Sequence, residues 1–423
     1  MIDAVLYVAA CLLGFGLIQR RLATTPITGP IIFVALGLLA SPRGIDLLDS
    51  DSTDVSTVVD VAFQGALVLL LFTDAAALHF TSWKRDAALP GRLLGIGLPL
   101  TIALGTVSAV LLLTDLSIWE AAIIGAIIAP TDAALGQAVV SNPRVPERIR
   151  QALDIESGLN DGISLPFVLI FIGLAEQDEG TGGLWTFIRE IGVAVGVGVA
   201  VGVAGGWLVV RATRAGWMGP AWSALQVIVI AVIAFAAADL GGGSGFIATF
   251  VAGRSYGELT RGRIDDNKGL AVDLGDGLVQ VSFLLFGALV LEPAFDVVTW
   301  QMIVVALLGL TVARLVPVAI SMIGARMAAP TLLYLGWFGP RGLATIVFGA
   351  LVVEQADLAG QRTIVTVATV TVALSVVLHG TTAFWGSQRY ADWSAANADG
   401  DAKAENAAVH KRVGRSRFRR HRS

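Results

Sequence analysis

The sequence is poor in charge. Asp, Glu, Lys and Arg make up 15% of its 423 residues, and 55% of the residues are hydrophobic. A soluble protein of this length carries about a quarter charged residues, so the deficit excludes an ordinary soluble domain and indicates a polytopic membrane protein. Cys11 is the only cysteine, which excludes an intramolecular disulfide and a thiolate metal site. The four histidines are far apart and show no metal-ligand spacing.

Long hydrophobic runs separated by short polar loops fill the first 386 residues. We expect about thirteen transmembrane helices, because about 17–25 mostly apolar residues cross a bilayer. The first run begins at Ile2 without a basic segment before it, so we expect a retained helix and not a removable signal peptide. The expected spans are residues 3–19, 27–41, 58–80, 89–113, 118–141, 149–175, 185–210, 221–240, 244–257, 268–291, 297–316, 331–353 and 362–386. Residues 387–423 are then a polar and basic tail, expected to be solvated.

The charges of the loops alternate in sign along the chain. The loop with Arg20 and Arg21 and the loop with Arg211 and Arg214 are basic, whereas the loop with Glu176 is acidic. By the positive-inside rule, the basic loops are cytoplasmic. We therefore expect a multi-pass protein of the cell membrane whose N-terminus is outside and whose C-terminus is in the cytoplasm, as an odd number of spans requires.

Glycines in the seventh span are spaced four residues apart, as Gly192 with Gly196 and as Gly198, Gly202 and Gly206. This small-xxx-small spacing is typical of helices that pack closely in membranes. We therefore expect tight helix packing along this span.

The six spans before the seventh and the six after it enter the membrane from opposite sides, which suggests an inverted repeat. Under that pairing, the fifth span with Thr131 and Asp132 corresponds to the twelfth span with the sequence Gly339–Gly342. Each contains a proline close to a charged residue near its middle. Helices broken at this depth are typical of ion sites in secondary transporters.

Two acidic clusters lie inside the hydrophobic runs, at Ala129–Asp132 and at Glu156–Asp161. A carboxylate at membrane depth costs roughly 2.5–3.5 kcal/mol on insertion scales, so it is kept for a purpose. From the helical rise, Asp132 lies about 21 Å and Asp161 about 18 Å from the expected start of its span. Since the two spans enter from opposite sides of a core about 30 Å thick, both side chains are expected near the midplane.

The side chains around these two carboxylates offer oxygen atoms. Ser157 and Asp161 are four residues apart and share a helix face, and Thr131 and Asp132 add hydroxyl, carbonyl and carboxylate oxygens. Hard cations such as Na⁺ prefer these ligands. A proton or a small monovalent cation can each neutralise a buried aspartate, so the two compete for one carboxylate.

Besides the two acidic clusters, few charged residues are expected at membrane depth. Arg341 is expected at the depth of the site and needs a partner, for which Glu156 is our candidate. Arg314, close to Pro317, is expected at the cytoplasmic end of the eleventh span. Asp74 is a candidate either for the site or its entry funnel or for an interfacial position.

Three motifs in this order resemble the monovalent cation:proton antiporter family of the NhaP/NHE type: Thr131-Asp132, then Glu156-Ser157-x-x-Asn160-Asp161, then Trp337-Phe338-Gly339-Pro340-Arg341-Gly342. The resemblance implies an all-helical NhaA-like antiporter fold in which two broken helices cross. It also implies a homodimer with a dimerisation domain and a moving six-helix core within residues 1–386. The core is expected to comprise roughly residues 58–175, 244–257 and part of 268–386.

The resemblance also implies roles for single residues. Asp161 would bind the ion and the proton, and the further ligands would be Asp132, Thr131 and Ser157, with Pro130 and Asn160 as support. Asn160 stands where electrogenic relatives have a second aspartate. Glu156 and Arg341 would form a structural ion pair. Many members have Glu in the third helix, where this chain has Asp74.

The expected function is secondary active transport and not enzymatic catalysis: Na⁺ (or Li⁺) exchanged for H⁺, electroneutrally and 1:1, in pH homeostasis. No cofactor and no nucleic-acid partner are expected; the partners are the two ions, membrane lipid and a second copy of the chain. A K⁺/H⁺ antiporter of the same fold is the alternative, because oxygen ligands alone do not select ion size. More remote alternatives are an intramembrane aspartyl hydrolase and a passive channel.

Overall fold

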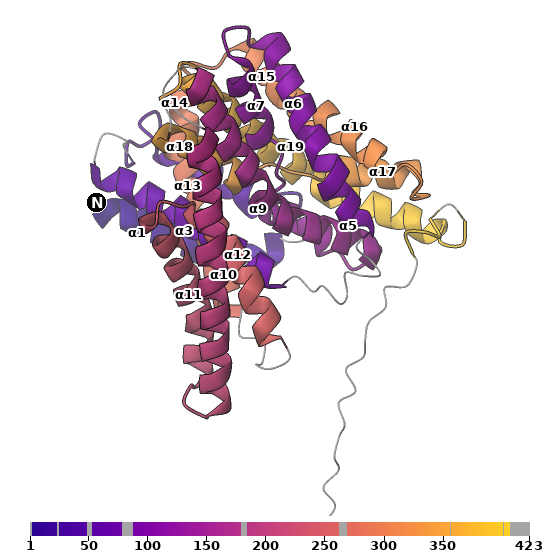
Figure 1. Ribbon diagram of the computed structural model, residues 1–423. Coiled ribbons are helices and arrows are strands. Elements are labelled where there is room, and N and C mark those ends of the chain that lie inside the picture. Colours follow the sequence, from indigo (N-terminus) through magenta and orange to yellow (C-terminus); the bar gives the residue numbers. More distant parts are fainter. Residues whose placement is uncertain are drawn as a thin grey trace, which may run out of the picture.

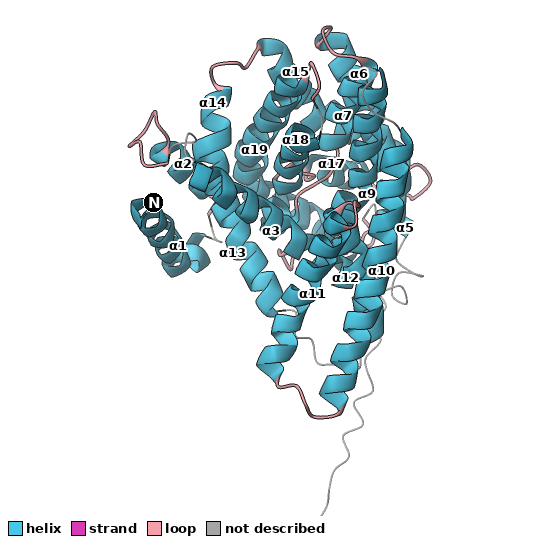
Figure 2. Cartoon of the chain, turned by 60° about the vertical axis from the view of Figure 1, so that its left-hand side comes forward, coloured by secondary structure: helices cyan, strands magenta, loops and turns pink. Residues whose placement is uncertain are grey.

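The structure is a computed structural model that describes residues 2–22, 25–48, 53–77, 88–178, 184–261, 269–355, 357–400 and 402–406. The regular structure in these residues is helical throughout (Figure 2). Eight of the described helical segments are long and apolar enough to cross a membrane, and shorter apolar helices accompany them. The expected all-helical membrane fold is confirmed.

The helices form two bundles. In the first bundle, α12 packs against both α3 and α10, and α13 packs against α2 and α3. Its members are α1 (Ile2–Leu22), α2 (Gly29–Ala40), α3 (Thr53–Ala77), α10 (Leu184–Arg214), α11 (Pro220–Leu240), α12 (Gly245–Thr260) and α13 (Gly269–Leu285), which continues through the π-helical turn η2 (Phe286–Leu291) into α14 (Glu292–Ala294). Figure 1 shows α10 and α11 of this bundle side by side.

The second bundle contains the interrupted helices. Here α7 packs against α6 and α9, and α19 packs against α7, α8, α15 and α18. Its members are α5 (Ala88–Arg92), η1 (Leu93–Gly97), α6 (Leu98–Leu112), α7 (Ile118–Ile127), α8 (Ala133–Val140), α9 (Glu147–Asp178), α15 (Trp300–Leu310), α16 (Val312–Ser321), α17 (Ala329–Trp337), α18 (Leu343–Gln355) and α19 (Gln361–Ala396). The bundles meet where α9 contacts α3, α10 and α12 and where α18 contacts α3.

The thirteen expected spans correspond to these helices, with differences at their ends. The fifth and twelfth spans are both interrupted near the middle, at residues 128–132 and 338–342, as expected. The last helix runs to Ala396, so residues 387–396, which we assigned to the tail, continue α19. The expected core included residues 58–80 and 244–257, whereas α3 and α12 pack mainly in the first bundle.

Local sequence signals explain where several helices begin. Ser117 caps α7 by accepting a hydrogen bond from the backbone N–H of Glu120, whose side chain accepts in return from Ser117 N–H. The buried Glu120 carboxylate also accepts from the backbone N–H of Gly360, at 2.6 Å. This second bond ties the start of α7 to the start of α19.

The glycines of α10 fall into two sets with different surroundings. A Cβ atom added at Gly198 would lie 2.6 Å from the carbonyl oxygen of Ala248 in α12, whereas one added at Gly196 would meet no atom within 4 Å. Gly202 likewise faces Ala252 of α12. The expected tight packing therefore belongs to the set that begins at Gly198, which lets α10 and α12 approach closely.

This difference gives a test of the packing. Gly198→Val should lower the free energy of unfolding by about 1–3 kcal/mol, because the added methyl groups overpack a closed interface. Gly196→Val is the matched control, with the same substitution two residues away on an open face, and should change stability much less. Thermal unfolding of the two purified variants in the same detergent measures the effect. Equal loss of stability in both would contradict the assignment of the interface.

Candidate functional site

The two interruptions cross and satisfy each other's backbone groups. The backbone N–H of Asp132, between α7 and α8, donates to the carbonyl oxygen of Pro340, between α17 and α18, at 2.8 Å. In return, Nη1 of Arg341 donates to the carbonyl oxygen of Pro130 at 3.2 Å. Backbone groups freed by a helix break need such partners because the hydrocarbon core offers no water. The crossing point is therefore a fixed structural unit.

Asp132 caps both half-helices that leave the crossing point. Its Oδ1 accepts from the backbone N–H of Leu135 in α8, at 2.9 Å, and its Oδ2 accepts from Leu343 N–H at the start of α18, at 2.8 Å. The N-terminal ends of both half-helices carry positive dipole ends, which favour a carboxylate. Asp132 is 7% exposed. Both of its oxygens therefore hold the crossing point together.

Polar side chains connect the crossing point to α9. Oγ1 of Thr131 lies 3.1 Å from Oγ of Ser157, and it accepts a hydrogen bond from Nδ2 of Asn160 at 2.6 Å. Asp161 follows on the same helix. Among the described residues, Oδ1 of Asp161 and Oδ1 of Asn160 are buried and accept no hydrogen bond. Buried oxygens without donors are rare in proteins, and they are the groups that a cation or a proton satisfies.

Asp74 of α3 lies against the same helix. A Cβ atom added at Gly158 would come within 3.1 Å of the Cβ of Asp74, so the missing side chain of Gly158 gives this carboxylate its place beside α9. The carboxylates of Asp132 and Asp74 both lie close enough to Asp161 to act on it electrostatically. The structure thus brings Asp74, Asp132 and Asp161 together from both bundles.

The expected ion pair between Glu156 and Arg341 is wrong. Glu156 pairs with Arg314: Nη1 and Nη2 of Arg314 donate to its two carboxylate oxygens, the second at 2.7 Å. Both side chains are buried, with 2% exposure. Arg341 is fully buried nearby, and its backbone N–H donates to Oγ of Ser375 at 2.7 Å.

Arg314 does not lie at the end of its span, which we expected from the proline that follows it. It is the third residue of α16, which continues through Pro317 to Ser321, so about 10 Å of helix follow Arg314. The absence of a side chain at Gly339 leaves room for the guanidinium, since a Cβ there would lie 2.5 Å from Nε of Arg314. We had considered only Arg341 as the partner of Glu156, although Arg314 is also an arginine inside an expected span.

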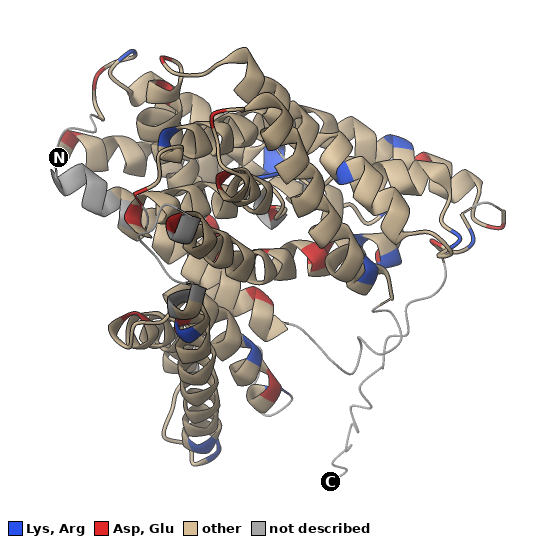
Figure 3. Cartoon of the chain, turned by 45° about the horizontal axis from the view of Figure 1, so that its top comes forward, with Lys and Arg blue, Asp and Glu red and all other residues tan. Residues whose placement is uncertain are grey.

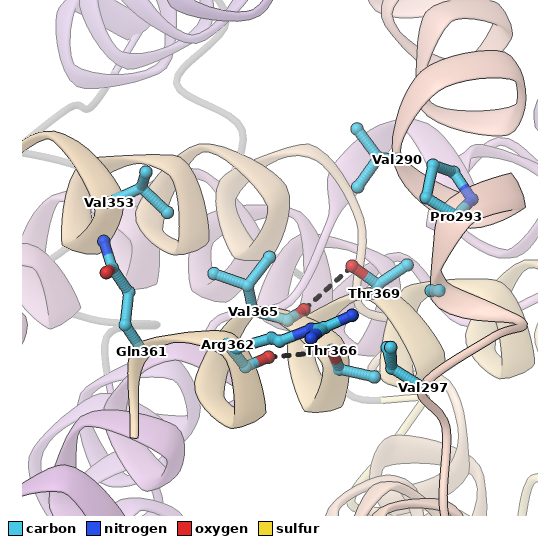
Figure 4. A pocket seen from close by; sticks show the side chains of 10 residues that line it. Val290, Pro293, Val297, Val353, Gln361, Arg362, Val365, Thr366 and Thr369 are labelled. Carbon is cyan, nitrogen blue, oxygen red and sulfur yellow. Dashed lines mark hydrogen bonds between the residues drawn. The ribbon is translucent and has the colours of Figure 1, made fainter. Parts of the chain in front are cut away.

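Most of the helical ribbon is drawn as uncharged residues, with few Asp, Glu, Lys or Arg between them (Figure 3). A separate pocket of about 350 Å³ lies between η2–α14 and the ends of α18 and α19. Figure 4 shows the side chain of Arg362 in it, beside Thr366 and Thr369. None of its ten lining residues is acidic. Its chemistry does not suit a cation, so the candidate site is the group of residues around Asp161.

A helical membrane protein in which two broken helices cross beside an unpaired carboxylate oxygen has the architecture of a secondary transporter. The model of the sodium/hydrogen exchanger transmembrane family matches residues 7–387, and the chain belongs to that family. This membership confirms the resemblance given by the three motifs.

Relatives and solved structures agree with the family. The K⁺/H⁺ antiporter NhaP of Alkalimonas amylolytica is 25% identical over 390 residues, which cover 89% of this chain and 64% of the relative. The K⁺/H⁺ antiporter NhaP2 of Shewanella oneidensis is 27% identical over 83% of this chain and 60% of the relative. The chain thus spans about three fifths of the length of these relatives. The sodium proton antiporter MjNhaP1 of Methanocaldococcus jannaschii has the same fold, with a TM-score of 0.72, 21% identity and coverage of 92% of this chain and 99% of that one.

The ion pair gives a second prediction. Glu156→Ala or Arg314→Ala alone should cost about 3–5 kcal/mol of stability, because each leaves a buried charge without its partner. The double variant should cost clearly less than the sum of the two, which a double-mutant cycle of unfolding in detergent measures. The matched cycle pairs Glu156→Ala with Arg341→Ala. A larger coupling energy in that second cycle would contradict the pairing in the structure.

Proposed function

We propose that this protein exchanges Na⁺ (or Li⁺) for H⁺ across the cell membrane, with Asp161 as the group that binds both. The observation that carries the proposal is the buried Oδ1 of Asp161, which accepts no hydrogen bond among the described residues. By contrast, both carboxylate oxygens of Asp132 accept hydrogen bonds from backbone N–H groups. Asp161 is therefore the carboxylate at the crossing point whose ligand can change.

The further ligands we propose for the cation are Thr131, Ser157, Asp132 and Asp74. The hydroxyls of Thr131 and Ser157 lie within 3.1 Å of each other and next to the α9 turn that carries Asp161. Hydroxyl and carboxylate oxygens suit a small hard cation. Asp74 adds a carboxylate from the first bundle, so cation binding would involve both bundles.

Transport then follows from competition for one carboxylate. A proton or a cation on Asp161 neutralises it, and the neutral site can cross between inward-facing and outward-facing states at low cost, whereas the bare anion cannot. We propose that the second bundle moves against the first, in a homodimer that the first bundle forms. The helix α1 has no buried residue within one chain, which supports a second copy or lipid along it.

The K⁺/H⁺ antiporter remains the second candidate, and the names of the relatives favour it: NhaP and NhaP2 are both described as K⁺/H⁺ antiporters. The solved relative of the same fold is a sodium proton antiporter. Membership in an exchanger family sets the intramembrane hydrolase aside.

The test of the function is exchange by the purified protein in liposomes that contain a pH-sensitive dye. Adding Na⁺, Li⁺ or K⁺ on one side should release protons from the other, and the cation that does so decides between the two candidates. Asp161→Asn should reduce the signal to that of empty liposomes, because the amide cannot be protonated or neutralised by a cation. Asp239→Asn, at the exposed end of α11, is the control and should exchange normally. Exchange that survives Asp161→Asn would refute the proposal.

We propose further that the exchange is electroneutral, since Asn160 provides an amide where a second exchangeable carboxylate would stand. A net charge per cycle would couple transport to voltage by about 2.3 kcal/mol per 100 mV, or about a 50-fold change in the balancing gradient. Exchange should therefore be the same with the membrane potential set to zero or to 100 mV. For a cation other than K⁺, valinomycin with K⁺ gradients sets this potential. A strong response to voltage would show a different stoichiometry.

A further inference from the structure

The described residues after α19, which are 397–400 and 402–406, fold back onto the second bundle. We expected a solvated tail here, yet Ala402 and Glu405 are both fully buried. Asn406 donates from Nδ2 to Oγ of Ser394 at 3.0 Å, which closes this segment onto the end of α19. Residues 397–400 and 402–406 thus lie against the end of α19; we call them the return segment.

Glu405 supplies a cap that α17 lacks in its own sequence. The N-cap residue of α17 is Ala328, which has no polar side chain. Oε1 of Glu405 accepts from the backbone N–H of Ala328 at 2.9 Å and from Oγ1 of Thr331 at 2.8 Å. A carboxylate at a helix start satisfies unpaired N–H groups and complements the helix dipole. Oε2 of Glu405 is buried and accepts no hydrogen bond among the described residues.

The return segment also holds the start of α9. Nη1 of Arg148, in the first turn of α9, donates to the carbonyl oxygen of Ala404 at 2.5 Å. Arg144, just before this helix, forms an ion pair with Asp392 of α19. One short segment therefore joins the beginnings of α9 and α17 to the end of α19.

Both helices lead from these contacts to the candidate site. The helix α17 is nine residues long, about 14 Å, and its last residue, Trp337, directly precedes the interruption that crosses at Asp132. The helix α9 reaches Glu156 about 12 Å after Arg148. Tyr334 stacks on Tyr390 with ring centroids 4.1 Å apart, so α17 is also packed against α19. A shift of either helix start would move the residues at the crossing point.

We propose that the return segment holds the ion site in position and that Glu405 is a positioning residue for cation binding. This inference rests on the proposed function of the site. Glu405 is not among the ligands that we propose for the cation. It sets the position of α17 and, through it, of the interruption at residues 338–342 that leads to Leu343, whose N–H donates to Asp132. Precise support of this kind is what ion ligands need, because they bind well only when held in place by their surroundings.

Two truncations separate the effect of the return segment from that of the residues after it. A chain that ends at Asn406 keeps every contact described above and should exchange cations like the full chain. A chain that ends at Ala396 loses Glu405 and Ala404 and should show a roughly tenfold higher KM for the cation, at the lower end of what the loss of an outer-shell contact costs a metal site. Equal KM values for both truncations would overturn the proposal.

Point variants in the full chain test Glu405 itself. Both hydrogen bonds end on Oε1, so Glu405→Gln can keep them and should leave KM close to the original value. Glu405→Ala loses both and should raise KM as the longer truncation does. Asp399→Ala, which changes an exposed acid of the same segment, is the control and should have no effect. A lower melting temperature of Glu405→Ala with an unchanged KM would mean a purely stabilising role and would overturn the proposal.

Hydrogen–deuterium exchange of the same purified proteins supplies a readout that does not depend on transport. Glu405→Ala should speed exchange at backbone N–H groups of residues 329–346 and leave α12 unchanged, while Glu405→Gln should match the original protein. If Glu405→Ala leaves hydrogen–deuterium exchange at residues 329–346 unchanged, the supporting role of the return segment is refuted, whether or not the protein transports a cation. Absence of cation transport by the original protein would refute only the proposed function. If Glu405→Ala does not fold, Thr331→Val removes one of the two donors and should speed exchange in the same residues.

Discussion

The double capping by Asp132 is the interaction on which the rest of the site depends. A helix broken inside a membrane exposes N–H and C=O groups that hydrocarbon cannot satisfy. Here one carboxylate binds Leu135 N–H and Leu343 N–H, at the starts of two half-helices far apart in the sequence. Because this carboxylate is used for structure, the neighbouring Asp161 is left with an oxygen that accepts no hydrogen bond in the described part of the chain. The structural role thus falls on Asp132, and the exchangeable role is the one that we propose for Asp161.

The two buried arginines near the crossing point, Arg314 and Arg341, have different partners. Arg314 neutralises Glu156 through two hydrogen bonds, so this pair adds no net charge to the second bundle. Arg341 is fully buried without that partner, and it lies close enough to act electrostatically on Asp161. If Asp161 binds the exchanged ions, as we propose, the charge at the crossing point depends on what Asp161 binds. A site of this kind responds to occupancy, because an uncompensated buried charge is costly.

Much of the fold follows from patterns in the sequence. The hydrophobic runs placed most ends of the expected spans within a few residues of the observed helix ends, because each span must be long and apolar enough for the bilayer. Pro130 and Pro340 indicated the two interruptions. The partner of Glu156 did not follow, since distance along the sequence does not distinguish Arg314, 158 residues away, from Arg341. The prediction that the span ends near Arg314 was wrong, because Pro317 lies inside a helix that continues to Ser321.

By itself, the sequence determined the class of this protein, the approximate ends of its helices and the residue types available for an ion site. These features depend on local composition and on hydrophobic length, which a linear pattern records. Tertiary structure alone decided which arginine neutralises Glu156, which glycines of α10 form an interface, and that Glu405 caps a helix whose N-cap residue lies 77 residues before it. Such choices depend on which surfaces meet after packing, and buried polar groups then take whatever partner the packing places within hydrogen-bond reach.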